Sequence, residues 1–220
     1  KALPSIISLI YKSKRPLILV GQGVRLANAQ EEFRNILQKM NIPVITTRLG
    51  IDLVESDDKL FVGRPGLYGD RAGNFAVQNA DLILCVGARL DTGIVGYDPL
   101  NWGRIAKKIV VDIDEKELDK PGITIFKKVK ADAKEFLVDL NNSINQKSLP
   151  NFDKWVKTCI SWKNRYPMVL EAYKKEKPVN SYLFTEKLSK ASSDGDTIVI
   201  DTSSCFHVSL HGSQWLLNQD

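Results

Sequence analysis

Three unbroken apolar runs limit most strongly what this chain can fold into: LILV at 17–20, LILCV at 82–86 and IVV at 109–111. In a sheet with one solvent-exposed face, apolar and polar residues alternate along each strand. Strands of a parallel sheet are buried on both faces and read as continuous apolar runs. Because stretches with helical spacing separate the three runs, the sequence predicts an α/β fold: a doubly wound, mainly parallel sheet with helices on both faces.

The expected elements alternate along the first 145 residues. Strands are expected at 17–20, 43–47, 81–88, 108–114 and 127–132, and helices at 3–14, 29–40, 72–79 and from the last strand to about 145. Folds of this kind bind ligands outside the carboxyl ends of the strands, near the point where the strand order reverses. We therefore expect a nucleotide-binding-like site in the loops that follow the strands.

The character of the sequence changes after residue 145, which predicts three parts. Residues 1–145 form the α/β domain, 146–177 a polar linker with a helix that breaks near Pro167, and 178–220 a C-terminal appendage. The appendage contains a helix, an Asp-Gly turn and a strand at 197–201, which begin a unit without completing it. From this, and from a first residue that is not methionine, we expect a fragment of a longer protein.

Charge and composition argue against several classes of protein. The net charge of +5 comes with lysine clusters, but no aromatic residues interleave with them, which favours a solvated surface over a nucleic-acid interface. No run approaches the roughly 20 apolar residues of a membrane helix. The three cysteines are widely spaced, so we expect no disulfide framework and no zinc site, and a cytoplasmic location.

A glycine loop follows the first expected strand, at Gly21, Gln22 and Gly23. Glycines let backbone N–H groups approach a phosphate closely, and the start of a helix adds partial positive charge. A complete G-x-G-x-x-G is absent, because Leu26 stands where the third glycine would be. A phosphate-binding loop and a plain tight turn are therefore both open.

Arg89 leaves the third expected strand at the edge of the sheet where ligands bind. Its planar guanidinium can hold a diphosphate or stack on a ring. The structural alternative is an ion pair with Asp91 or Asp112, and the sequence favours neither role.

Acidic residues follow the next two strands. Asp112 can accept hydrogen bonds from ribose hydroxyls. Asp114 can cap a helix, with Glu117 three residues later as in a capping box. Asp132 can do either, and capping the helix that starts there is favoured.

Residues typical of catalysis or metal binding do not form a set. His207 and His211 lie four apart beside Cys205, but no acidic ligand or second cysteine pair completes a metal site. Cys85 lies in an apolar strand and is expected to be an inert core thiol. No G-x-S-x-G elbow or nucleophile–base pair is present. The sequence predicts a binding site, with no catalytic and no metal-binding residues.

Three stretches, taken together, resemble one family. They are GRPGLYGDRAGNFAVQNADLILCVGARLD at 63–91, KKIVVDIDEKELDK at 107–120 and VKADAKEFL at 129–137. Their order and spacing resemble the central domain of acetolactate synthase-type thiamine-diphosphate enzymes, with its Gly-x-x-Gly loop, Gly-Ala-Arg-x-Asp strand end and Asp-Ile-Asp strand end. The resemblance extends over roughly residues 4–140.

The resemblance implies a three-domain parent enzyme that uses thiamine diphosphate and Mg²⁺ and acts on 2-keto acids by carboligation or decarboxylation. Residues 178–220 would be the truncated start of its thiamine-diphosphate-binding domain, with Asp201-Thr202-Ser203 where many relatives have Asp-x-Gly. The family's binding motifs for both cofactors are not in this chain, so we expect the chain alone to be inactive. Its implied partners are the remaining domains of the parent chain, in a homodimer or homotetramer.

In acetolactate synthases the central domain holds FAD with no redox part in the net reaction, and other relatives hold ADP or nothing. The matching positions here are Gly21, Gln22, Gly23, Thr47, Arg48, Gly66, Leu67, Tyr68, Gly87, Ala88, Arg89, Asp91, Asp112, Ile113 and Asp132. Two departures stand out: Tyr68 replaces a common histidine, and Thr92-Gly93-Ile94 replaces Asp-Arg-Val. Bound FAD or ADP and an empty structural domain are both open. The rivals outside the family are a free-standing nucleotide-binding module and a purely structural interaction domain.

Overall fold

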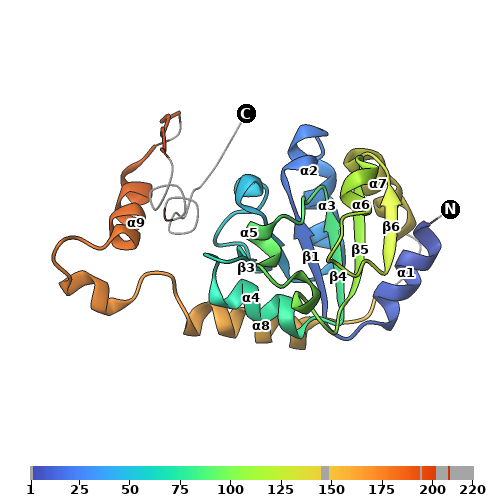
Figure 1. The fold of residues 1–220 in the computed structure, drawn as a ribbon, viewed down its shortest axis with the longest axis horizontal. Coiled ribbons are helices and arrows are strands. Elements are labelled where there is room, and N and C mark those ends of the chain that lie inside the picture. Colours follow the sequence, from blue (N-terminus) through green and yellow to red (C-terminus); the bar gives the residue numbers. More distant parts are fainter. Residues whose placement is uncertain (1, 145–148, 194, 202–207, 209–220) are drawn as a thin grey trace.

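A six-stranded parallel sheet lies at the centre of the protein (Figure 1). The structure is a computed structural model that describes residues 2–144, 149–193, 195–201 and 208. The strands are β1 (Pro16–Val20), β2 (Val44–Thr46), β3 (Phe61–Gly63), β4 (Leu82–Val86), β5 (Lys107–Asp112) and β6 (Lys127–Lys130). With helices packed on both faces, the sheet confirms the expected doubly wound α/β fold.

The strand order, β3-β2-β1-β4-β5-β6, reverses between β1 and β4. From β1 the chain winds outward through β2 to β3, then crosses back to β4 on the other side of β1 and continues to β5 and β6. β1 and β4 pair in parallel from Pro16↔Leu82 to Val20↔Val86. Open α/β sheets leave a crevice at such a reversal, outside the carboxyl ends of the strands.

Helices cover both faces of the sheet (Figure 1). The α-helices among the described residues are α1 (Leu3–Lys12), α2 (Gln22–Leu26), α3 (Gln30–Met40), α4 (Arg71–Asn79), α5 (Thr92–Val95), α6 (Glu115–Leu118), α7 (Ala133–Ile144), α8 (Asp153–Arg165) and α9 (Ser181–Ala191). Of these, α9 lies away from the sheet (Figure 1). α1, α3 and α7 pack with Ile18 and Val20 of β1. α4 and α8 pack on the opposite face with Leu17 and Leu19. Because successive strand residues point to opposite faces, β1 is apolar throughout.

α8 is fixed to the second face by hydrogen bonds and by ring contacts. The Trp155 Nε1–H donates to the carbonyl oxygen of Pro16 at 2.8 Å. The rings of Trp162 and Tyr166 meet Phe75 of α4 edge to face, with centroids 5.9 and 5.4 Å apart. The sequence assigns this helix to the linker part, yet it packs directly on the α/β domain.

Between residues 149 and 193 the chain forms α8, a 3-10 helix and α9. α8 ends at Arg165, ahead of Pro167, which agrees with the break expected near that proline, and a 3-10 helix follows at Glu171–Lys175. Within the described ranges, no helix has the length and apolarity needed to cross a membrane.

The structure corrects the sequence prediction at two strands. Residues 197–201 were expected to form a strand, but they form none, and Val199 is 91% exposed. A strand needs a neighbour to satisfy its backbone groups, and the described residues offer this segment no ladder partner. β3 was not expected. Its three residues are too short a run to stand out, and they add to the edge of the sheet beside β2.

Candidate functional site

A cleft of about 600 Å³ lies at the carboxyl edge of the sheet, where the strand order reverses. Loops that follow β1, β2, β4, β5 and β6 line it. Ten of the residues expected from the sequence contribute to the lining: Gln22, Gly23, Thr47, Arg48, Gly87, Arg89, Asp91, Asp112, Ile113 and Asp132. The cleft therefore brings together residues that are far apart in the sequence.

Five expected residues are not part of the lining: Gly21, Gly66, Leu67, Tyr68 and Ala88. The loop at Gly66 and Leu67 packs against the start of α5 instead. The Leu67 N–H donates to the Gly93 carbonyl oxygen at 3.0 Å, and a Cβ placed on Gly66 would lie 2.2 Å from that oxygen. Tyr68 is 55% exposed. The glycine at position 66 is thus explained by packing.

The rest of the lining was not expected from the sequence. It consists of Leu26, Ala27, Leu49, Ile94, Val111, Asp114, Glu117, Ala131 and Ala133. Most are close chain neighbours of expected residues, so proximity to the motifs was a usable signal. Leu26 and Leu49 are each more than half exposed, as is Ile113, and the three give the cleft an apolar rim.

Glycines lie where the ends of β1 and β4 meet backbone to backbone, and two of them, Gly23 and Gly87, line the cleft. The Gly21 N–H donates to the Val86 carbonyl oxygen at 3.1 Å, and the Gly23 N–H donates to the Gly87 carbonyl oxygen at 2.9 Å. A Cβ on Gly21 would lie 2.4 Å from that Gly87 oxygen, and Gly87 itself has a φ of +56°. Close strand approach therefore accounts for these glycines, and the two N–H groups are already engaged.

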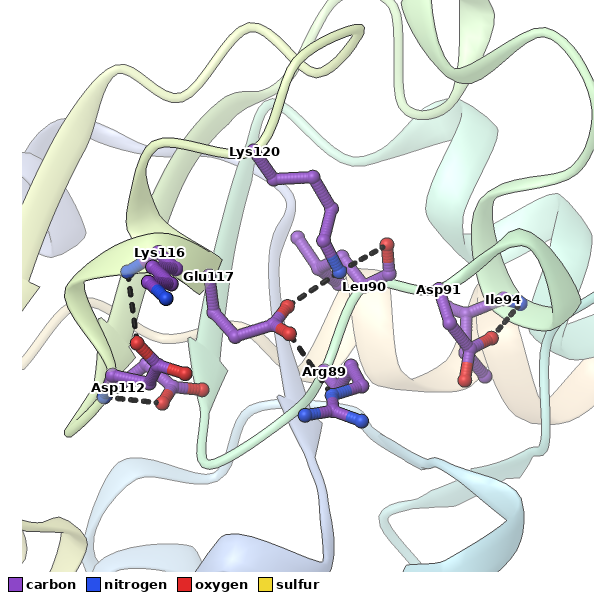
Figure 2. A network of polar contacts seen from close by, with 9 residues as sticks. Arg89, Leu90, Asp91, Ile94, Asp112, Lys116, Glu117 and Lys120 are labelled. Atoms are coloured by element: carbon purple, nitrogen blue, oxygen red, sulfur yellow. Dashed lines mark hydrogen bonds and ion pairs between the residues drawn. The ribbon is translucent and has the colours of Figure 1, made fainter.

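Arg89 joins a network of charged groups on the β5 side of the cleft (Figure 2). Its Nε lies 3.0 Å from Oε1 of Glu117, while the Lys120 ammonium contacts Oε2 of the same carboxylate. The Lys120 Nζ also lies 3.4 Å from the Leu90 carbonyl oxygen. Asp91 and Asp112 were the partners expected if Arg89 formed a structural ion pair, but the observed partner is Glu117, which lies on α6.

The acidic residues at the strand ends bind local backbone groups. Asp91 accepts from the Ile94 N–H at 3.1 Å and caps α5. Asp112 accepts from the Asp114 N–H at 2.9 Å. Asp132 accepts from the N–H of Lys134 at 2.7 Å. A carboxylate has about four lone-pair positions, so these contacts leave room for a ligand hydroxyl.

The capping prediction for α6 is half right. Asp114 caps this helix by accepting from the Lys116 N–H at 2.9 Å. Glu117 does not complete a capping box, because its carboxylate pairs with Arg89 and Lys120. The Glu117 carboxylate, expected in a capping box, therefore belongs to the lining of the cleft.

The cleft is rich in negative charge. Among the described residues that line it, five carry carboxylates (Asp91, Asp112, Asp114, Glu117 and Asp132) and two carry guanidinium groups (Arg48 and Arg89). Such a lining suits hydroxyl and amine donors of a ligand better than an uncompensated anion.

No metal centre is formed by the part of the chain that the structure describes. Across these residues, no group of three or more His, Cys, Asp or Glu is placed to hold a metal ion. His207, His211 and Cys205 lie outside the described residues. Cys85 is fully buried in β4, and burial raises the pKa of its thiol to about 12, in keeping with the expected inert core position.

Comparison with known proteins identifies one family. The family model described as "Thiamine pyrophosphate enzyme, central domain" matches residues 3–140. The acetolactate synthase large subunit of Lactococcus lactis subsp. lactis is 31% identical over 205 residues, which is 90% of this chain. A probable acetolactate synthase large subunit of Methanococcus aeolicus is 33% identical over 71% of the chain. The subunit of Cyanidium caldarium is 31% identical over 73%.

The relatives are much longer proteins than this chain. The aligned part makes up 33% of the Lactococcus lactis protein, 27% of the Methanococcus aeolicus protein and 28% of the Cyanidium caldarium protein. The chain thus spans about a third or less of the relatives it matches.

Proposed function

The chain belongs to the thiamine pyrophosphate enzyme central-domain family, and on that premise we propose its function. It serves as the central domain of a larger enzyme that depends on thiamine diphosphate and Mg²⁺ and acts on 2-keto acids, as an acetolactate synthase does. The observation that carries this proposal is the similarity to acetolactate synthase large subunits over 90% of the chain in one case.

The proposed role of the domain itself is to bind FAD or ADP in the cleft. Asp112 ends β5 at the position where a carboxylate receives ribose hydroxyls in related folds. Ile113 and Leu49 offer apolar surface against which a planar ring can pack. Arg89 is the cation through which the cleft would meet a phosphate. Together these residues offer a contact for each part of a nucleotide, namely the ring, the ribose and the phosphate.

The remaining proposals concern the whole enzyme. The parent assembles as a homodimer or homotetramer in the cytoplasm, and the other domains supply the residues that bind thiamine diphosphate and Mg²⁺. Residues 178–220 open the domain that binds the diphosphate. The chain alone is inactive, because the family's binding motifs for thiamine diphosphate and Mg²⁺ are not in it.

One observation favours a second candidate, a purely structural interaction domain. The N–H groups of Gly21 and Gly23 are engaged by β4, so this loop offers a phosphate less than its glycines suggest. In this role the domain would keep the same fold without binding a nucleotide.

Calorimetry separates these two candidates. We expect the 220-residue chain to bind ADP or FAD, and flavin absorbance of the purified protein to report any FAD retained from expression. Asp112→Ala should weaken binding, because it removes the ribose acceptor. A chain that binds neither nucleotide, with an unchanged thermal unfolding profile in their presence, supports the structural role instead.

The parent enzyme is tested through its gene. We expect a Gly-Asp-Gly…Asn stretch within about one further domain length, ~150 residues, downstream of the region matched here. The full-length product should consume a 2-keto acid only with thiamine diphosphate and Mg²⁺ added, whereas the 220-residue chain should not. A gene that lacks this stretch would leave a free-standing nucleotide-binding module or an interaction domain.

A further inference from the structure

The Arg89–Glu117 pair places a carboxylate where a ligand phosphate would bind. Arg89 comes from the end of β4 and Glu117 from α6, so the two meet only in the folded protein (Figure 2). Oε1 of Glu117 lies 3.0 Å from Nε of Arg89, and Oε2 contacts the Lys120 ammonium. Both oxygens of this carboxylate therefore face a cation.

The contact uses the edge of Arg89 that recognises anions. Carboxylates and phosphates bind arginine through parallel N–H groups of the guanidinium fork, one of which is Nε–H. The Glu117 side chain is 16% exposed and the Arg89 side chain is 69% exposed. Glu117 thus lies on the inner side of the pair, and a phosphate that approaches Arg89 from the cleft comes within a few ångströms of its negative charge.

The rest of the cleft offsets this charge only in part, because Arg48 is the other guanidinium of the described lining. The Gly21 and Gly23 N–H groups, the expected phosphate donors, are bonded to the carbonyl oxygens of Val86 and Gly87. Four further carboxylates line the cleft with Glu117. The acceptor oxygens of Asp112 and Asp132 and the apolar rim, by contrast, suit a ribose and a ring.

We propose that Glu117 is a specificity-determining residue of the cleft. By binding the Nε edge of Arg89, one of the two edges through which a guanidinium binds anions, it makes the cleft favour the nucleoside part of its ligand over the diphosphate. This inference rests on the proposed binding of a nucleotide and names the part of the nucleotide that provides affinity. The ligand class it predicts is an adenosine-type nucleoside or a nucleotide with few phosphates.

The test is isothermal titration of adenosine and ADP into three forms of the 220-residue chain. Glu117→Gln keeps the size and hydrogen-bonding groups of the side chain but removes the charge, leaving Arg89 and Lys120 available to a phosphate. We expect its affinity for ADP to rise about tenfold at low ionic strength, because one like charge is removed from beside the diphosphate. Adenosine affinity should change by less than about twofold, since adenosine carries no phosphate.

Glu115→Gln is the matched control. Glu115 lies on the same helix, makes the same kind of ion pair with Lys130 at 2.9 Å, and does not line the cleft. It should move neither affinity. Adding salt to roughly 0.5 M should shrink the ADP gain of Glu117→Gln, as screening of charged pairs requires. Thermal unfolding of each variant checks that the fold is intact.

The outcomes separate this inference from the proposed function. If Glu117→Gln gains no more ADP affinity than Glu115→Gln, or if wild type binds ADP more tightly than adenosine, the role of Glu117 is wrong while nucleotide binding stands. If no form binds either ligand, nucleotide binding itself fails and the role of Glu117 fails with it.

Discussion

Two groups of charged residues in this protein differ in how far they are exposed to solvent. In the cleft, Arg89 and Glu117 lie at the edge of the sheet and pair with each other. Between β3 and α8 lies a second group, the buried cluster, formed by the buried Arg64 and Asp70 and the half-buried Lys163. Arg64 is 3% exposed, and its Nε and Nη2 have no hydrogen-bond partner among the described residues.

Short contacts to the backbone and to one ring hold the buried cluster together. Asp70 accepts from the Arg64 backbone N–H at 2.6 Å, and Lys163 donates to the carbonyl oxygens of Ser56 and Phe61 at 2.6 and 2.9 Å. Arg64 and Lys163 also lie over the Phe61 ring, 5.1 and 4.9 Å from its centre. Burial raises the pKa of Asp70 and lowers the pKa values of Arg64 and Lys163.

This difference in solvent exposure determines how much each group contributes to the stability of the fold. Charges near water cost little to keep and contribute little to stability, so they can exchange one partner for a ligand. Charges out of water depend on each other, and removing one exposes the desolvation cost of the rest. The cleft charges are therefore suited to exchange partners with the proposed ligand, while the buried cluster holds α8 against β3.

The largest effect is expected from Asp70→Ala. This change leaves the buried Arg64 without its counter-charge and its N–H without an acceptor. Removing one partner of a buried charged pair costs about 3–5 kcal/mol, so the free energy of unfolding in urea should fall by that order. Asp70→Asn, which keeps the acceptor, should lose less. Equal stability of Asp70→Ala and wild type would mean that the cluster is not a unit.

A smaller and pH-dependent effect is expected from Lys163→Met. Two carbonyl oxygens lose their donor, which costs about 1–3 kcal/mol at neutral pH. Because burial lowers the pKa of Lys163, the native state binds fewer protons than the unfolded state below the ordinary lysine pKa. Wild-type stability should therefore rise relative to the variant between pH 7 and 10.

Lys157→Met is the control for the pH effect, since Lys157 is an exposed residue of the same helix. Urea unfolding at pH 7, 8.5 and 10 should give curves for this variant that run parallel to wild type. A Lys163→Met curve that also runs parallel would contradict the assignment of Lys163 to the buried cluster.

The smallest effect is expected from Arg89→Ala. Its side chain is 69% exposed, and such pairs contribute roughly 0–1 kcal/mol. Thermal unfolding should shift by no more than a few degrees, in contrast to Asp70→Ala. A loss as large as that of Asp70→Ala would abolish the distinction between the two regions.

Much of the fold was predictable because the buried strands of a parallel sheet appear in the sequence as unbroken apolar runs. The runs that became β1, β4 and β5 are apolar on both faces, and both faces are covered. The failures come from segments whose state depends on a neighbour. β3 exists because β2 lies beside it, and the equally apolar 197–201 has no such neighbour among the described residues.

The position of the candidate site was predictable from the sequence, but the ion pairs between its residues were not. Strand ends meet at one edge in any doubly wound fold, which is enough to bring Gly23, Arg89 and Asp112 together. The partner of Arg89 depends on where α6 turns after β5, and the sequence suggested only Asp91 and Asp112 for it. The buried cluster was missed because charged residues such as Arg64 are expected at the surface.

The pairing of β1 with β4 also sets the order in which the domain can assemble during synthesis. β1 finds its first neighbour once β2 has been made, but its other edge stays open until Leu82–Val86 has left the ribosome. An open apolar edge is where one chain adds to another. One edge of β1 thus stays unpaired throughout the translation of β2, β3 and α4, and a ribosome that stalls in that stretch holds the chain with this edge open to another chain.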